Sequence, residues 1–237
     1  MLSPMSIWTR IGEALQALRE GESLSDVFGR LKTPPEQSVG FAIAVIALGA
    51  KMAKADGQVT RTEVTAFRDV FHIPPEAERQ AARVFNLARR DVAGFEGYAA
   101  SVARMFGDRS DPLADLLEGL FHIAAADGEF HPDEERFLRR VWEIFGLPET
   151  LFRGLRSRYA PDAEPDPWAV LGVTPDTPLP EIRRAWRALV RDSHPDRMMA
   201  RGVPEEAVRL ATQRLVDINK AWEEISAMSR AAGSAPG

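Results

Sequence analysis

Cysteine is absent from the chain, and several other features that would define its class are missing or rare. Without cysteine the protein has no disulfides, no thiolate metal sites and no thiol catalysis, which excludes zinc ribbons. Its histidines show no ligand spacing such as a pair at i and i+4; they are His72, His122, His131 and His194. We therefore predict a protein without a catalytic centre of its own, and we expect no cofactor.

Long hydrophobic runs and a basic excess are also missing. The longest apolar stretch, residues 39–50, is too short for the roughly 20 residues of a membrane-spanning helix and predicts a buried core helix. The N-terminus has no basic region followed by an apolar one, so we expect no signal peptide. A formal net charge of -5 argues against a protein that coats nucleic acid. We expect a cytoplasmic protein with no transmembrane segment and no nucleic-acid partner.

The first 30 residues contain an amphipathic segment. Its apolar side chains follow the helical repeat and form one face; they are Ile7, Trp8, Ile11, Leu15 and Leu18. Such a face usually docks on its own protein. Peripheral contact with the inner face of the membrane is the alternative, but the polar side of this segment lacks the lysine and arginine excess of interfacial helices.

Helical periodicity dominates the chain, and no convincing alternating strand is present, so we predict an all-α fold. Residues 31–159 contain an internal repeat, in which Asp56-Gly57 and Glu63 correspond to Asp127-Gly128 and Glu134. Each copy fits a helix, a turn at a glycine able to take positive φ, and a second helix. We therefore predict a helical bundle built from duplicated helix-turn-helix units.

The letters His-Pro-Asp occur twice, and the first copy lies in the second of these repeat units. Pro132 suits the first position of a helix, and the acidic residues after it complement the positive end of the helix dipole. We interpret this copy as a helix start. The acidic residues of both turns are weak candidates for a cation site, because hard metals prefer clustered oxygens; they are Asp56, Glu63, Asp127 and Glu134. Their spacing does not match a calcium loop, so capping is the preferred interpretation and no metal is predicted.

Prolines and acidic residues interrupt the helical pattern at residues 160–165, which predicts a short linker. The second part, residues 166–229, contains a helix from about Glu181 to Asp192 and a long helix from about Glu205 to Met228. Between them lie the second His-Pro-Asp and a polar loop. Residues 230–237 are predicted to be a disordered tail.

The helix before the second copy has one apolar face and one basic face. From Arg183 to Arg201 there are six arginines against only Asp192 and Asp196. Solubility alone would mix the signs, so this stripe indicates an acidic partner surface. The apolar faces of the two helices predict an antiparallel hairpin with the His-Pro-Asp loop at its open end.

Residues 166 to about 228 resemble the J domain of the DnaJ co-chaperone family. The residues that carry the resemblance are "DPWAVLGV", the basic helix, "HPD" and the closing "INKAW". Trp168 and Trp186 stand where that family usually has tyrosine, and we expect their packing to be conserved.

The resemblance implies that the J domain binds a DnaK-type chaperone and stimulates its ATP hydrolysis. His194, Pro195 and Asp196 would then form the signalling loop. The partner-binding face would consist of Arg183, Arg184, Arg187 and Arg191.

The stretch "RMMARGVPEE" is similar to the DjlA branch of that family, and residues 31–159 resemble the TerB-like helical domain that this branch carries upstream. The resemblance implies a co-chaperone whose TerB-like domain docks client proteins or envelope-associated proteins. The alternative is a cation-binding or tellurite and envelope-stress protein that acts through its TerB-like domain.

Overall fold

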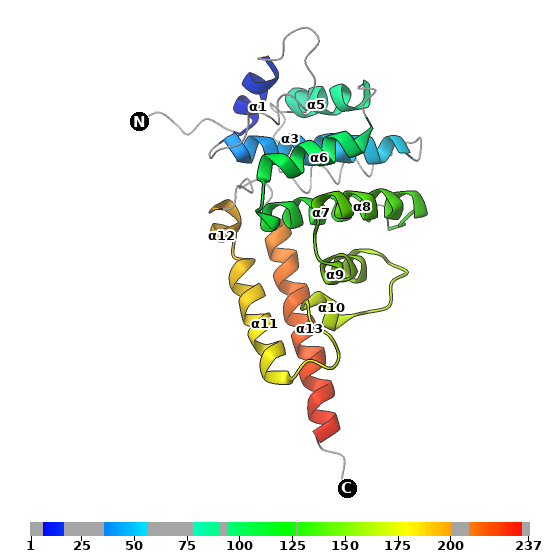
Figure 1. The fold of residues 1–237 in the computed structure, drawn as a ribbon, viewed down its shortest axis with the longest axis vertical. Coiled ribbons are helices and arrows are strands. Elements are labelled where there is room, and N and C mark those ends of the chain that lie inside the picture. The colour runs from blue at the N-terminus through cyan, green and yellow to red at the C-terminus, as the bar shows by residue number, and fades with distance from the viewer. Residues whose placement is uncertain are drawn as a thin grey trace.

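A computed structural model describes residues 7–16, 36–55, 78–90, 94–126, 128–200 and 209–233. All regular secondary structure in these ranges is α-helical, which confirms the all-α prediction. Figure 1 shows stacked layers of helices with a long hairpin extending below them, and the C-terminus at the far end of that hairpin.

The upper layers surround α3, Glu36–Ala55. Around it lie α1, Ile7–Gln16, α5, Glu78–Arg90, and α6, Phe95–Phe106. Every residue from Val39 to Met52 is buried, so the apolar run is a core helix as predicted. A helix that is apolar all round requires this degree of enclosure.

The amphipathic N-terminal face contacts this core. Ile11 and Leu15 of α1 are fully buried in it. The interpretation as a helix that docks on its own protein therefore holds for these two residues. Leu18 and the side chains of Ile7 and Trp8 lie outside the described part of the chain.

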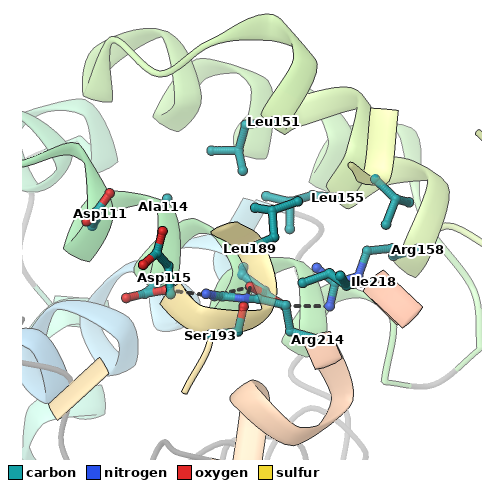
Figure 2. A pocket seen from close by; sticks show the side chains of 13 residues that line it. Asp111, Ala114, Asp115, Leu151, Leu155, Arg158, Leu189, Ser193, Arg214 and Ile218 are labelled. Atoms are coloured by element: carbon teal, nitrogen blue, oxygen red, sulfur yellow. Dashed lines mark hydrogen bonds and ion pairs between the residues drawn. The ribbon is translucent and has the colours of Figure 1, made fainter. Parts of the chain in front are cut away.

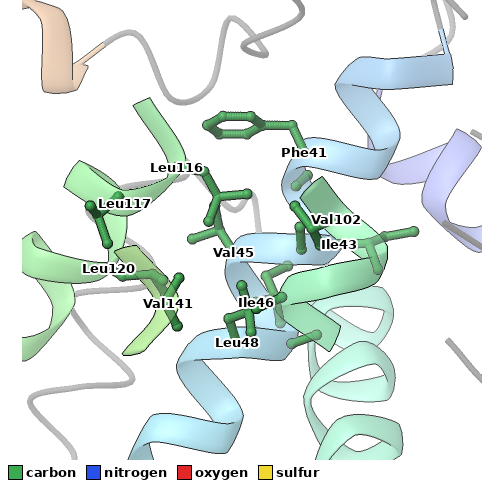
Figure 3. Packing of buried hydrophobic residues seen from close by; sticks show 14 of the residues in the cluster. Phe41, Ile43, Val45, Ile46, Leu48, Val102, Leu116, Leu117, Leu120 and Val141 are labelled. Carbon is green, nitrogen blue, oxygen red and sulfur yellow. The ribbon is translucent and has the colours of Figure 1, made fainter. Parts of the chain in front are cut away.

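The lower layer contains α7, Ser110–Ala124, and α8, Pro132–Phe145, followed by α9, Glu149–Tyr159. Figure 3 shows leucines of α7 and Val141 of α8 packed toward α3. Gly128 takes a positive φ of 84° in the turn before α8, as predicted. The corresponding turn of the first repeat unit, Asp56-Gly57, lies outside the described residues.

The C-terminal part begins with α10, Pro167–Val170, which Asp166 caps by accepting a hydrogen bond from the backbone of Ala169. The helix α11, Leu179–Asp192, and the helix α13, Arg209–Gly233, then form an antiparallel hairpin (Figure 1). Its own small core is a separate cluster of buried side chains: Leu171, Ile182, Ile218, Ala221 and Ile225.

The structure corrects two expectations about this part. The loop after the second His-Pro-Asp begins as a short helix, α12, Pro195–Ala200, because Pro195 suits a first helical position and Met198 is fully buried. The helix α13 ends at Gly233, so residues 230–233 of the predicted tail are helical. The start of the long helix, predicted at Glu205, lies outside the described residues.

Candidate partner-binding site

The hairpin holds its two helices together with a pair of tryptophans. The rings of Trp186 on α11 and Trp222 on α13 stack with their centroids 5.1 Å apart. The indole N–H of Trp186 donates a hydrogen bond of 3.0 Å to the side-chain oxygen of Asn219. Both contacts fix the register of α11 along α13, so the aromatic residue that replaces tyrosine here packs as expected.

The arginines of α11 lie on its solvent side. All four residues of this arginine face are exposed: Arg183, Arg184, Arg187 and Arg191. Arg184 pairs with Glu181 at 3.6 Å and Arg191 with Asp192 at 3.3 Å, both at the helix surface. Within the described ranges, Arg183 and Arg187 have no ion pair. The face therefore keeps a positive charge that the described residues do not neutralise.

The second His-Pro-Asp forms the tip of the hairpin, which we define as residues 194–196. The carbonyl of His194 accepts the first hydrogen bonds of α12, from the backbone N–H groups of Arg197 and Met198. The backbone N–H of Asp196 donates to Nδ1 of His194 over 3.3 Å. The side chains of His194 and Asp196 are 60% and 80% exposed, so the carboxylate points to solvent.

The first His-Pro-Asp has a different role. Pro132 begins α8, and the backbone N–H of His131 donates a hydrogen bond of 2.9 Å to the carboxylate of Glu134. Asp133 pairs with Arg136 one turn later. These contacts confirm the interpretation of this copy as a helix start.

Three of the four metal candidates lie outside the residues that the structure describes. Asp56, Glu63 and Asp127 lie outside them, and Glu134 serves as the cap of α8. Among the residues described, no group of three or more metal-ligating side chains occurs.

A buried charge network, which the sequence analysis did not identify, joins the hairpin to the bundle. Glu118 of α7 accepts hydrogen bonds of 2.6 Å from Arg158 of α9 and from Arg214 of α13. Arg214 also pairs with Asp115 at 2.7 Å (Figure 2). Arg158 pairs with Asp217 at 2.8 Å. The acidic residues at i and i+3 in the apolar run "LADLLEGLF" are a signal that could have indicated it.

This network is stable only because its charges compensate one another. Burial alone would raise the pKa of Glu118, but the charges and hydrogen bonds of Arg158 and Arg214 outweigh burial and lower that pKa to about 2. Burial and the neighbouring Glu118 raise the pKa of Tyr159, whose hydroxyl donates to the same carboxylate. Glu118, Arg158 and Arg214 are therefore charged at neutral pH.

A cleft of about 240 Å³ adjoins the network between the bundle and the hairpin. Leu151 and Leu155 of α9 face Leu189 of α11 and Ile218 of α13 across it (Figure 2). Ser193, next to the tip, lines the same cleft and is 2% exposed. The tip is thus exposed on one side and adjoins the bundle on the other.

Among the described residues, no helix has the length and apolar character needed to cross a membrane.

Comparisons with known proteins match most of the chain. The sequence model of the family described as "Tellurite resistance protein TerB" matches residues 42–157. The co-chaperone protein DjlA of Coxiella burnetii is 30% identical, and the match covers 73% of this chain and 72% of that protein. The DjlA of Photobacterium profundum is 29% identical, with 80% and 78% covered. The DjlA of Vibrio cholerae is 29% identical, with 85% and 82% covered. No solved structure matches the chain.

Proposed function

The chain belongs to the DjlA family of co-chaperones, and on that premise we propose that it binds a DnaK-type chaperone through its hairpin and stimulates ATP hydrolysis there. The partner would contact the arginine face and the tip together. The chain itself supplies no catalytic residue to the reaction; it regulates the ATPase of its partner.

One observation carries this proposal: an exposed carboxylate at the tip lies at the end of a helix whose basic face the described residues neutralise only in part. Asp196 is 80% exposed, and Arg183 and Arg187 have no ion pair among the described residues. A positive face that is left open in this way favours an acidic partner surface, because opposite charges steer the encounter and fix its register.

The two charged elements would have separate tasks. Guanidinium groups form planar, bidentate contacts with carboxylates, so the arginine face would supply recognition and orientation. The carboxylate of Asp196, held at a helix start, would then enter the partner and disturb a charge network near its nucleotide. A tip that is already ordered loses little conformational entropy on binding, which favours tight association.

The TerB-like part would bring client proteins or envelope-associated proteins to the hairpin. We place it second to the hairpin because the exposed tip and the arginine face both lie on the hairpin. A cation-binding function is not proposed, since Glu134, one of its candidate ligands, already caps α8.

The test compares the two His-Pro-Asp copies within one chain. Single-turnover ATP hydrolysis by the cognate DnaK-type chaperone is measured with the wild-type chain, with Asp196→Asn and with Asp133→Asn. We expect Asp196→Asn to lower the stimulated rate at least about tenfold, because a charge that acts inside an interface contributes several kcal/mol. Asp133→Asn should stimulate like the wild type. Equal stimulation by all three chains would overturn the proposal.

A further inference from the structure

The tip of the hairpin is anchored in the core of the bundle and not in the core of the hairpin. Met198 of α12 is fully buried, and it belongs to the large hydrophobic cluster that contains α3, α6 and α7. The separate cluster of the hairpin does not include it. Figure 1 shows α12 at the end of the hairpin that faces the bundle. A residue only two positions after Asp196 thus anchors the tip in the other part of the molecule.

The start of α13 makes the same connection farther along the chain. Leu210 and Ala211 are buried in the cluster of the bundle. A Cβ atom added to Gly119 of α7 would lie 3.7 Å from the side chain of Leu210 and 3.8 Å from that of Val45. The first turn of α13 therefore packs against α7, so that α12 and the start of α13 both contact the bundle.

The buried charge network keeps these contacts in register. Apolar packing is not directional, whereas Arg214 must meet Asp115 and Glu118 of α7 in one geometry to compensate the burial of their charges. Arg158 of α9 makes the corresponding contact with Asp217 at 2.8 Å. Sliding or rotation of α13 on the bundle would leave buried charges without partners.

A close approach of two backbones completes the interface. A Cβ atom on Gly154 of α9 would lie 2.6 Å from the carbonyl oxygen of Ala169 on α10, a distance that real Cβ atoms do not adopt. Beside it, Arg153 donates a hydrogen bond of 2.6 Å to Asp166, the residue that caps α10. Glycine at this position lets α10 lie directly against α9.

We propose that Met198 is a positioning residue, through which the TerB-like bundle holds the His194–Asp196 tip in the conformation that its partner binds. The inference rests on the proposed function. The bundle then acts as the scaffold of the tip, in addition to any docking of clients. The charge network and Gly154 keep the bundle and the hairpin aligned so that Met198 reaches its site.

The proposal predicts a specific split in the kinetics. Stimulated single-turnover ATP hydrolysis is measured over a range of concentrations of the full chain. Met198→Ala should raise the half-maximal concentration about tenfold, because the backbone at the tip must then be ordered on binding. The maximal rate should stay at the wild-type value, since Asp196 is intact. Met198→Leu, which refills the site, should stay within about twofold of wild type.

A second variant perturbs the interface without touching the tip. Gly154→Ala forces α10 away from α9 and should raise the half-maximal concentration in the same way. Its matched control is Gly97→Ala on α6, where an added Cβ meets nothing within 4 Å. An unchanged half-maximal concentration in Met198→Ala and Gly154→Ala would overturn the proposal. So would a loss of maximal rate at an unchanged half-maximal concentration.

Hydrogen exchange tests the anchor independently of the partner. In Met198→Ala, the backbone amides of Arg197 to Ala200 should exchange faster, while those of Ile218 to Ile225 in the hairpin core should not change. Equal protection of α12 in wild type and variant would show that the bundle does not order the tip. If the wild-type chain fails to stimulate any ATPase, the proposed function fails, whereas the exchange experiment still decides the role of Met198.

Discussion

The two His-Pro-Asp sequences of this chain adopt the same backbone arrangement in different surroundings. In both, the proline begins a helix, at Pro132 and Pro195, and the histidine carbonyl accepts the first helical hydrogen bonds. The tripeptide therefore specifies a helix start and nothing more. Its function depends on the charges that surround it and on how it is held.

The arginines near the two copies differ in how many of them have a carboxylate partner among the described residues. The arginines of α8 each have carboxylate partners: Arg136 pairs with Asp133, Arg139 with Glu135, and Arg140 with Glu96. On α11, by contrast, Arg183 and Arg187 have no partner in the described part of the chain. A surface whose charges are already paired gains little from binding another protein, whereas unpaired charges gain from a complementary charge on the partner.

The two copies also differ in what supports them. The first is held locally, by a carboxylate three residues away in the chain, Glu134. The second is held by distant residues, through Met198 in the bundle core and through Arg214 on Glu118. Local support makes the first copy robust, and tertiary support makes the second dependent on the whole molecule.

The largest effect is expected from breaking that tertiary support. Glu118→Ala leaves Arg158 and Arg214 buried without their shared partner, and it should lower the free energy of unfolding by about 3–5 kcal/mol. Chemical denaturation measures the change. Glu143→Ala, which removes a 46% exposed partner of Arg140, is the control and should cost less than about 1 kcal/mol. Equal losses would contradict the assignment of the network as the main link.

The same carboxylate predicts a pH dependence. Its pKa falls from 4.5 to about 2 in the folded chain, so its contribution to stability is complete above about pH 4.5 and is lost as the pH falls toward 2. The difference in unfolding free energy between wild type and Glu118→Gln should therefore shrink over this range. Denaturation at a series of pH values checks it, and a constant difference would show that Glu118 is not ionised in the folded chain.

Reversing the charge of the arginine face should weaken the binding of the partner. Arg183→Glu combined with Arg187→Glu should lower the affinity for a DnaK-type chaperone about 100-fold, because like charges would then face each other. The matched control after the first copy, Arg136→Glu with Arg140→Glu, should bind within about twofold of wild type. Calorimetric titration at low and high salt measures both, and the wild-type affinity should fall with salt. Similar losses in the two double variants would place the contact elsewhere.

The smallest effect is expected from removing the hydrogen bond that holds the first His-Pro-Asp copy in place. Glu134→Ala removes the acceptor for the backbone N–H of His131 and should cost about 1 kcal/mol of stability, the usual contribution of a helix cap. Thermal unfolding measures this change. Stimulation of the partner ATPase should not change; a loss there would give the first copy a role in binding.

Much of the fold follows from local patterns. The apolar run at residues 39–50 predicts a core helix, Pro132 with Glu134 predicts a helix start, and the paired faces of residues 181–192 and 205–228 predict a hairpin. Each depends on periodicity, capping or proline geometry, which act within a few residues. The arginine face is likewise a property of one helix.

The joint between bundle and hairpin was decided by the tertiary structure alone. Met198 lies in a polar stretch and gives no periodic signal. Gly154 lies within a helix, and glycine is required there only because α10 packs directly against it. Asp115 and Glu118 interrupt an apolar run, which is a local signal of burial, but nothing local reveals that Arg158 and Arg214 of two other helices pair with them. Patterns within a segment determined the elements and their charged faces, whereas burial at contacts between distant segments determined how the tip is held.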